Sequence, residues 1–490
     1  MRKEPALRAR GRAWLLVVTL FTCYAYFPAR WADWNQNSRF DLTRALVEQR
    51  TIRIDAYYLN TGDYSAFGGH VYSDKAPGLS FVAVPAYYAF EAVAGIPLVQ
   101  SALNRMAANP AFASTLRQDG SGLQNEKVAV AAALCAVTWV VVSLPSVLLA
   151  LLLYRGLRRT SVATGDASLM VLAYGLATIA FPYSTVFYGH QLAAVLLFAA
   201  FQLLSGDRIP SSGRLFIAGV LLGLAVLTEF PALITAALLT AYAAWSLRPK
   251  LHTLVWLAAG ALPFAITLGC YNAAAFGSPF TSSYRYLATF SNIANTGTLG
   301  FTHPRWEAVW GITFSPYRGL FFLSPFLLLA VPGTWRLLRQ PATRPATLLS
   351  TLIVLAHGLA IVSWYDWRGG YAIGPRNLLP VLPFLMPAVA KGWTLAARHG
   401  TLRWLLLAVS FAFVWVAAVS GQDFAPVDFD NPLLQYFWPK LRAGDITRNL
   451  GMVMGLHGWW SLMPPLFLST TAAWFLARHP SGRFAAGETL

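Results

Sequence analysis

Residues that could do chemistry gather in one long polar segment of an otherwise apolar chain. Residues 30–126 follow the first apolar stretch and hold nine of the chain's 20 carboxylates. An amphipathic surface helix expected over 38–50, capped by its first serine, would carry Asp41, Arg44 and Glu48 on one face, because successive residues turn by about 100°. A carboxylate at Asp41 could take a proton from a hydroxyl group. The alternative is an ion-pair ladder along a solvated face.

A second group surrounds a turn at 73–78, whose Pro-Gly pair is expected to start a helix. Lys75 would then lie at a helix N-terminus, where a cation and free N–H groups suit a phosphate. Asp74 could orient the lysine or act as a base itself, and an ordinary helix cap is the alternative. Upstream, Asp55 is a further candidate base. His70 leads into the turn and is a candidate contact for an acceptor or a sugar.

Later segments add polar groups at the expected outer edge of the membrane. Arg376 begins an apolar segment and could hold an anionic group with two hydrogen bonds, or it could serve as an interface anchor. Asp366 and Trp367 precede it as candidate acceptor or sugar contacts, although tryptophan also collects at membrane interfaces. Glu229 lies between two apolar segments. Burying a carboxylate at that depth in a membrane costs free energy, so its presence suggests a functional role. His190 begins another apolar segment. It could be an ordinary buried histidine, or it could lie beside the donor phosphate. Glu229 and His190 thus join the two cations as candidate donor contacts.

The composition indicates a membrane protein. Hydrophobic residues make up 56% of the 490 residues and charged residues only 12%, about half the share in soluble domains. The net charge of +17 is interpreted as an orientation signal, and no nucleic-acid partner is expected. Cys23, Cys135 and Cys270 lie in apolar segments, so they predict neither a disulfide framework nor a metal site.

The elements that must position these residues are apolar helices. About twelve transmembrane helices are expected, giving an all-α polytopic fold, with the first read as an uncleaved anchor and not a secretory signal. The expected spans are 13–29, 128–153, 165–182, 185–204, 214–227, 230–247, 253–275, 319–335, 345–363, 377–395, 404–420 and 458–477.

The charge distribution predicts the orientation of these spans. If segment 78–95 is a half-buried surface helix, the inner side holds 20 Lys and Arg against four acids, and the outer side 17 against 16. Both termini are then cytoplasmic, and 30–126 is an outer loop with surface helices carrying part of the site. We expect a single integral membrane domain, 1–490, in the inner membrane of a bacterium.

The arrangement resembles the GT-C superfamily of lipid-linked-sugar glycosyltransferases, in particular the protein O-mannosyltransferase-like branch that includes aminoarabinose transfer to lipid A. The run RFDLTR at 39–44 resembles the family's first loop helix, and DKAPGL at 74–79 resembles its Glu-Lys-Pro-Pro-Leu turn. Residues 223–231 are similar to a short helix hairpin of the family, and 374–380 to a late outer-edge motif of bacterial members. The chain departs from the family at 35–37, where Asn-Gln-Asn stands in place of an Asp-Glu pair.

The resemblance implies an inverting transfer of a sugar from a polyprenyl phosphate to a hydroxyl acceptor on the outer face. With the Asp-Glu pair absent, it shifts the acid role to Asp41, or to Asp55 or Asp74, and assigns Lys75 and Arg376 to the departing phosphate. The partners would be the lipid-linked sugar, membrane lipid and an acceptor in the cell envelope. The sequence identifies no definite cofactor, and it leaves open whether a divalent cation assists the reaction.

Two other functions fit many apolar spans. A transporter or flippase would place polar groups at mid-membrane and show two similar halves, whereas here the polar groups collect at one edge. A polysaccharide polymerase or ligase would carry its large loop late in the chain.

Overall fold

The computed structural model describes residues 3–28, 30, 33–108, 127–205, 210–292, 296–298 and 300–477, without the side chains of 3–10 and 249. Every apolar segment expected to span the membrane contains helix, often broken at prolines. These helices are α1 (Lys3–Tyr26), α6 (Lys127–Thr138) continued by η3 (Trp139–Ser143) and α7 (Leu144–Arg159), α8 (Thr164–Leu176), α9 (Ala180–Tyr183), α10 (Gly189–Leu204), α11 (Ser212–Thr228), α12 (Ala232–Ser246), α13 (Leu254–Phe276), α16 (Leu320–Leu323), η6 (Pro325–Leu329), α17 (Ala330–Leu338), α18 (Arg344–Ser363), η7 (Arg376–Val381), α19 (Leu382–Leu395), α20 (Gly400–Val419) and α23 (Met463–Ala477).

The chain is a polytopic helical membrane protein. Among the described residues, four helices are long and apolar enough to cross a membrane, namely 127–159, 250–276, 344–363 and 376–419. Shorter apolar helices, α10, α11, α12 and the run 325–338, lie between them. The expected total of about twelve crossings therefore stays a prediction.

Glycines allow the closest helix contacts. A Cβ atom on Gly219 of α11 would strike the backbone of α13, and one on Gly260 of α13 would strike the backbone of α11. Gly333 of α17 and Gly392 of α19 form the same kind of contact. Small residues at such positions let helix backbones approach closely in a membrane, where van der Waals packing drives helix association.

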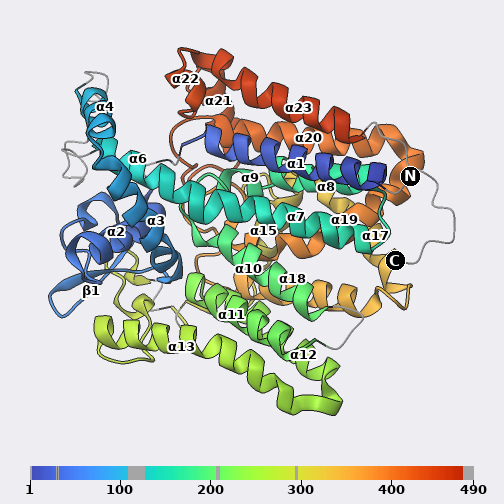
Figure 1. The fold of residues 1–490 in the computed structure, drawn as a ribbon, viewed down its shortest axis with the longest axis horizontal. Coiled ribbons are helices and arrows are strands. Elements are labelled where there is room, and N and C mark those ends of the chain that lie inside the picture. Colours follow the sequence, from blue (N-terminus) through green and yellow to red (C-terminus); the bar gives the residue numbers. More distant parts are fainter. Residues whose placement is uncertain are drawn as a thin grey trace.

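The segment after α1 forms a small layer at one end of the helices (Figure 1). It contains α2 (Trp34–Arg44) with η1 (Ala45–Gln49), the short η2 (Tyr58–Asn60), a two-stranded antiparallel sheet of β1 (Tyr64–Phe67) and β2 (His70–Ser73), α3 (Gly78–Ala94) and α4 (Pro97–Ala107). A Gly-Gly pair with positive φ at both residues closes the hairpin, as a type I′ turn requires. The start of α1 and the end of α23 lie at the opposite end of the molecule in this view.

Two details of this layer differ from the sequence expectation. The first helix begins at Trp34 and is capped by Asp33, whose carboxylate accepts from the Gln36 N–H, so Ser38 is not its N-cap. Residues 35–44 are all buried, so apart from Trp34 at its start the helix has no solvated face. The remaining small elements are η4 (Arg248–Thr253), η5 (Ser283–Tyr286), α15 (Trp306–Thr313), η8 (Ala396–His399), η9 (Leu433–Phe437), α21 (Trp438–Arg442), α22 (Leu450–Val453) and η10 (Gly458–Leu462).

Helix α3 starts at Gly78, next to the position expected from the Pro-Gly pair. Its buried residues lie in the first part of the helix, and most residues from Tyr88 onward are exposed, so its expected place as a half-buried surface helix stays a prediction. It meets α4 at an angle of 91°. A Cβ atom on Gly78 would lie 2.6 Å from the backbone of Leu227, so the start of α3 packs directly on the end of α11. This contact brings the turn at 73–78 beside the hairpin between α11 and α12.

Candidate active site

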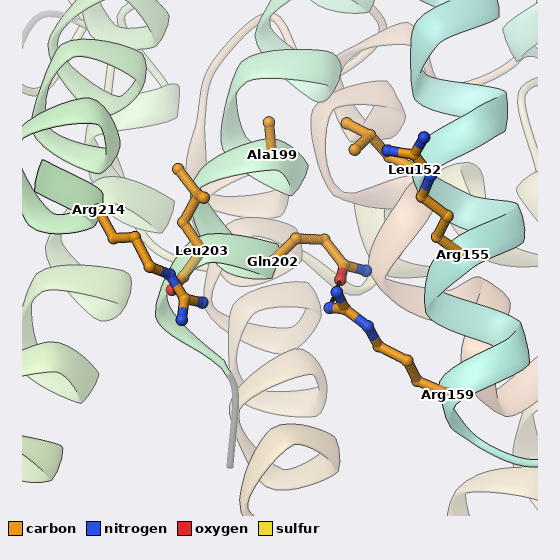
Figure 2. A pocket seen from close by; sticks show the side chains of 7 residues that line it. All are labelled: Leu152, Arg155, Arg159, Ala199, Gln202, Leu203 and Arg214. Carbon is orange, nitrogen blue, oxygen red and sulfur yellow. Dashed lines mark hydrogen bonds between the residues drawn. The ribbon is translucent and has the colours of Figure 1, made fainter. Parts of the chain in front are cut away.

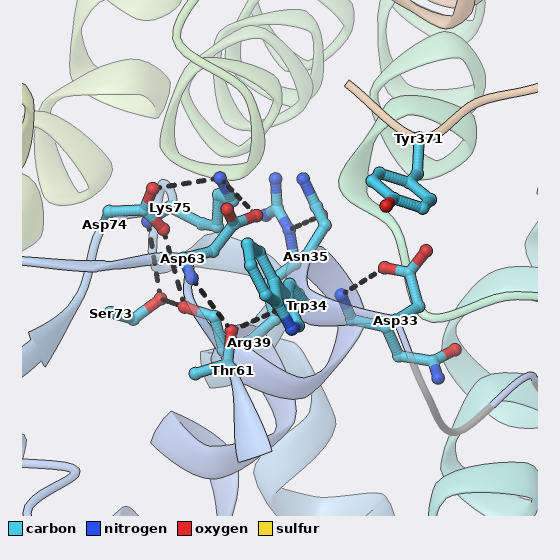
Figure 3. Close-up of polar contacts among 12 residues, drawn as sticks. Asp33, Trp34, Asn35, Arg39, Thr61, Asp63, Ser73, Asp74, Lys75 and Tyr371 are labelled. Carbon is cyan, nitrogen blue, oxygen red and sulfur yellow. Dashed lines mark hydrogen bonds and ion pairs between the residues drawn. The ribbon is translucent and has the colours of Figure 1, made fainter. Parts of the chain in front are cut away.

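Lys75 lies between two carboxylates at the start of α3 (Figure 3). Its Nζ is 2.8 Å from Asp63 Oδ2 and 2.9 Å from Asp74 Oδ2. Burial by itself lowers the pKa of Lys75, but the two carboxylates outweigh it and raise the pKa above its ordinary value. Burial raises the pKa of Asp74, and Lys75 opposes that rise. Lys75 is therefore charged at neutral pH, and its charge is largely balanced by protein groups.

A buried ion pair connects α2 to the hairpin between α11 and α12. Arg39 Nη2 lies 2.6 Å from Glu229 Oε1. The same guanidinium donates to Asn35 Oδ1 and to the carbonyl oxygens of Ala76 and Thr228. Burial raises the pKa of Glu229 and the positive charge of Arg39 lowers it. Arg39 thus holds three segments of the chain together beside Lys75.

His190 extends this ion pair toward α10. Its Nδ1 lies 3.4 Å from Glu229 Oε1, and its ring packs edge-on against Tyr183 and Tyr188. A Cβ atom on Gly189 would strike the Glu229 carboxylate, so glycine at this position allows the approach. The predicted donor-side residues His190 and Glu229 are therefore brought together.

Arg376 reaches the same region from the loop before α19. Its Nη1 donates to the hydroxyl of Tyr188 at 3.3 Å and to the carbonyl oxygen of Tyr371 at 3.4 Å. Tyr188 in turn donates to Asp33 Oδ2 at 2.6 Å. Among the described residues, Arg376 forms no ion pair with a carboxylate. Its positive charge is therefore more available to an anion than that of Lys75.

The two cations act on a shared set of acids. Arg376 and Lys75 both lower the pKa of Glu229 and of Asp366, while burial raises it in each case. Lys75 and Arg376 therefore both lie within electrostatic range of Glu229 and of Asp366, and His190 contacts Glu229. The structure brings these five predicted residues into one region, hereafter the polar cluster.

Asp33 is a member of this region that the sequence reasoning missed. Burial raises its pKa, while the Tyr188 hydrogen bond and the charge of Arg376 lower it. Unlike Asp41, it keeps part of its surface exposed. Its position before a helix was a usable signal, since Asp is a preferred N-cap.

Asp41 lies in a different environment. It is 1% exposed, and its Oδ1 accepts from Asn60 Nδ2 at 3.0 Å. Burial raises its pKa to about 8. Its charged neighbours are Arg44 and Glu48, which pair with each other at 2.8 Å. No hydrogen bond or ion pair between described residues connects Asp41 to Lys75 or Arg376.

Three other predicted residues lie apart from the polar cluster or are closed off. Asp55 pairs at 2.8 Å with His70 at the start of β2, where both side chains are exposed, and Asp55 also accepts from the backbone N–H of Val71. Trp367 is buried, and its ring packs against Tyr317 and over Gly311. A ring enclosed in this way has no open face for stacking on a sugar.

Two exposed aromatic rings border the polar cluster instead. Trp34 covers Gly62, next to Asp63, and Tyr371 lies near Asp33 (Figure 3). Trp34 is 42% exposed and Tyr371 54% exposed. Within the described part of the chain, no group of three or more His, Cys, Asp or Glu side chains is placed to hold a metal ion.

Comparisons with known proteins give similarities of fold only. No family model matches the chain, and no curated protein matches it at a significant level. Among solved structures, ArnT from Cupriavidus metallidurans bound to undecaprenyl phosphate is 15% identical, with 97% of this chain and 74% of that chain covered and a TM-score of 0.48. The structure of the same protein in the apo state is 14% identical, with 96% of this chain and 74% of that chain covered and a TM-score of 0.47.

A third similar structure is the archaeal oligosaccharyltransferase AglB from Archaeoglobus fulgidus, in complex with an inhibitory peptide and a dolichol-phosphate. It is 12% identical, covers 96% of this chain and 60% of that chain, and has a TM-score of 0.40. The ArnT structure holds undecaprenyl phosphate and the AglB structure a dolichol-phosphate. At these identities and overlaps, no activity transfers from them to this chain.

Proposed function

We propose that the chain is a membrane glycosyltransferase that moves a sugar from a polyprenyl phosphate to a hydroxyl acceptor on the outer face of the bacterial inner membrane. The observation that carries the proposal is the chain of contacts Asp33–Tyr188–Arg376. It places a partly exposed carboxylate near an arginine whose described contacts are all with uncharged groups. One group can remove a proton and the other can stabilise a leaving phosphate.

The proposed reaction is a single displacement. Asp33 accepts the proton of the acceptor hydroxyl. At the same time, the oxygen of that hydroxyl forms a bond to the anomeric carbon. The bond from that carbon to the phosphate oxygen breaks, and the polyprenyl phosphate leaves with the electron pair. Arg376 stabilises the charge that grows on this phosphate, because it is already positioned in a site largely withdrawn from water. The anomeric configuration inverts.

The remaining residues of the polar cluster would position these two groups and the sugar. The balanced group of Lys75 with Asp63 and Asp74 keeps the first turn of α3 in place, with Lys75 as a second contact for phosphate. Trp34 and Tyr371 offer exposed ring faces for a sugar. Asp366 forms no ion pair with a described residue and is a candidate to accept from a sugar hydroxyl.

The position of the polar cluster disfavours the transport alternative. A carrier gathers its polar binding groups near mid-membrane. Here they come from helix ends and loops: the cap of α2, the start of α3, the end of α11 and the loop before η7.

The test is a transfer assay with purified full-length protein and a panel of labelled polyprenyl-phosphate sugars. Arg376→Gln should lower turnover by about two to three orders of magnitude, as expected for loss of a group that stabilises transition-state charge. The matched control is Arg368→Gln. Arg368 lies in the same loop and forms an exposed ion pair with Glu307, so its loss should leave turnover nearly unchanged.

Equal effects of the two substitutions would contradict the role of Arg376. Absence of transfer from every donor in the panel, together with protein-dependent movement of the intact lipid across vesicles, would overturn the proposed activity in favour of a flippase.

A further inference from the structure

A second candidate site, with a mostly apolar surface and basic groups at its edge, lies between α7, α10 and α11 (Figure 2). It is a cavity of about 410 Å³. Its polar lining consists of three arginines and one glutamine, and its apolar lining of two leucines and one alanine, as follows: Arg155, Arg159, Arg214, Gln202, Leu152, Leu203 and Ala199. We call this cavity the arginine pocket.

The charges of the arginine pocket are not balanced by described residues. Arg159 donates to Gln202 Oε1 at 3.0 Å, and Arg214 to the carbonyl oxygen of Leu203 at 2.6 Å, and both acceptors are neutral. No hydrogen bond or ion pair joins Arg155 to a described residue. Arg155 and Arg159 are exposed and Arg214 is half-buried, so all three cations are open to an anion that enters the pocket.

The arginine pocket and the polar cluster lie at opposite ends of the same helices. Helix α10 runs from Gly189 beside Glu229 to Gln202 in the pocket, a rise of about 20 Å. Helix α11 runs from Arg214 in the pocket to its C-cap at Glu229, about 22 Å. In the orientation predicted from the charges, the pocket therefore opens at the cytoplasmic leaflet.

We propose that the arginine pocket binds the head group of an anionic phospholipid from the inner leaflet. Arg155, Arg159 and Arg214 would hold the phosphodiester, and the apolar wall at Leu152 and Leu203 would contact the first part of the acyl chains. Basic pockets between transmembrane helices on the cytoplasmic side suit such head groups. This site is separate from the proposed transfer reaction and does not depend on it.

The test measures retention of phosphatidylglycerol by the full-length protein in phosphatidylcholine nanodiscs and by native mass spectrometry. Replacing all three pocket arginines by Gln should weaken binding on the order of a hundredfold, from roughly 1 kcal/mol for each arginine near the surface. The matched control replaces three exposed arginines at the same predicted side, Arg336, Arg339 and Arg398, and should keep wild-type binding. Arg155→Gln alone, which breaks no described contact, should weaken binding about fivefold.

Competing anions identify the source of the phosphate. Glycerol 3-phosphate and inorganic phosphate should not displace the lipid at millimolar concentration, because they lack the acyl contacts. Equal loss of binding in the pocket and control variants would show general surface attraction and overturn the proposal. Binding of free phosphate without binding of phosphatidylglycerol, or displacement of the lipid by stoichiometric undecaprenyl phosphate, would also overturn it.

Discussion

The ion pair between Arg39 and Glu229 should be a large single contribution to the stability of the polar cluster. The two side chains are 2% and 9% exposed, and their charged atoms are 2.6 Å apart. Arg39→Gln would leave Glu229 as a buried carboxylate without its nearest cation and would remove the donor to the Thr228 carbonyl. Breaking a buried pair by removing one partner costs about 3–5 kcal/mol, and we expect that loss here.

A double-mutant cycle isolates the interaction itself. Glu229→Gln should cost less than Arg39→Gln, because the amide oxygen can still accept from the arginine. The double variant should be more stable than the sum of the two losses predicts, with a coupling energy of about 2 kcal/mol. Unfolding in mixed detergent micelles, followed by the fluorescence of the 18 tryptophans, measures these differences.

An exposed pair serves as the control for this cycle. Arg368 and Glu307 are 2.7 Å apart but 44% and 63% exposed, so their coupling should stay below about 1 kcal/mol. A coupling energy between Arg39 and Glu229 no larger than that of the control pair would refute the reasoning. It would mean that the buried pair does not hold α2 against the end of α11.

Three further substitutions test separate parts of the structure. Burial holds the pKa of Asp41 at about 8, above its ordinary 3.8, so the free energy of unfolding of the wild type should fall as pH rises between these values, by at most about 1.4 kcal/mol per pH unit. Asp41→Asn should remove that part of the decline, as measured by unfolding at a series of pH values. An unchanged slope in Asp41→Asn would contradict the raised pKa of Asp41. Gly78→Ala should destabilise by about 1–3 kcal/mol in the same assay, because the new Cβ atom meets the backbone of Leu227; an unaltered midpoint would show that α3 can move away. Tyr188→Phe removes a hydrogen bond that lowers the pKa of Asp33, so that pKa should rise and the acid limb of the pH–rate profile should move to higher pH. A shift to lower pH would show that this hydrogen bond does not stabilise the charged form of Asp33.

Hydrophobic patterning predicted the helical segments well. Each apolar window of the sequence contains helix, and the turn at 73–78 leads into a helix that starts at Gly78. The early segment 35–44 shows where the pattern fails, since it is mostly polar but buried. Its polar groups are satisfied by partners far along the chain: the Gln36 amide accepts from Phe187, and Arg39 pairs with Glu229. Such pairing cannot be read from local periodicity.

The same limit of local patterns explains which site residues the sequence could predict. Lys75, Arg376, Glu229 and His190 follow from their positions at predicted helix ends, and the structure brings them together. Asp41 was assigned from the charged face of one helix, which ignores the segments that cover that helix. Asp33 was not a candidate, because the role proposed for it depends on a hydrogen bond to Tyr188 and on the charge of Arg376, both more than 150 residues away in the chain.

We propose above all that Asp33, linked to Arg376 through the Tyr188 hydroxyl, activates the acceptor. Steady-state transfer of a labelled sugar from its polyprenyl phosphate, compared for wild type, Asp33→Asn and Asp41→Asn, tests it most directly. We predict that Asp33→Asn lowers turnover by about two to four orders of magnitude, while Asp41→Asn, which mimics the protonated side chain, stays within a few-fold of wild type at neutral pH. Full turnover in Asp33→Asn, with loss of turnover in a folded Asp41→Asn, would contradict the claim and return the base to Asp41.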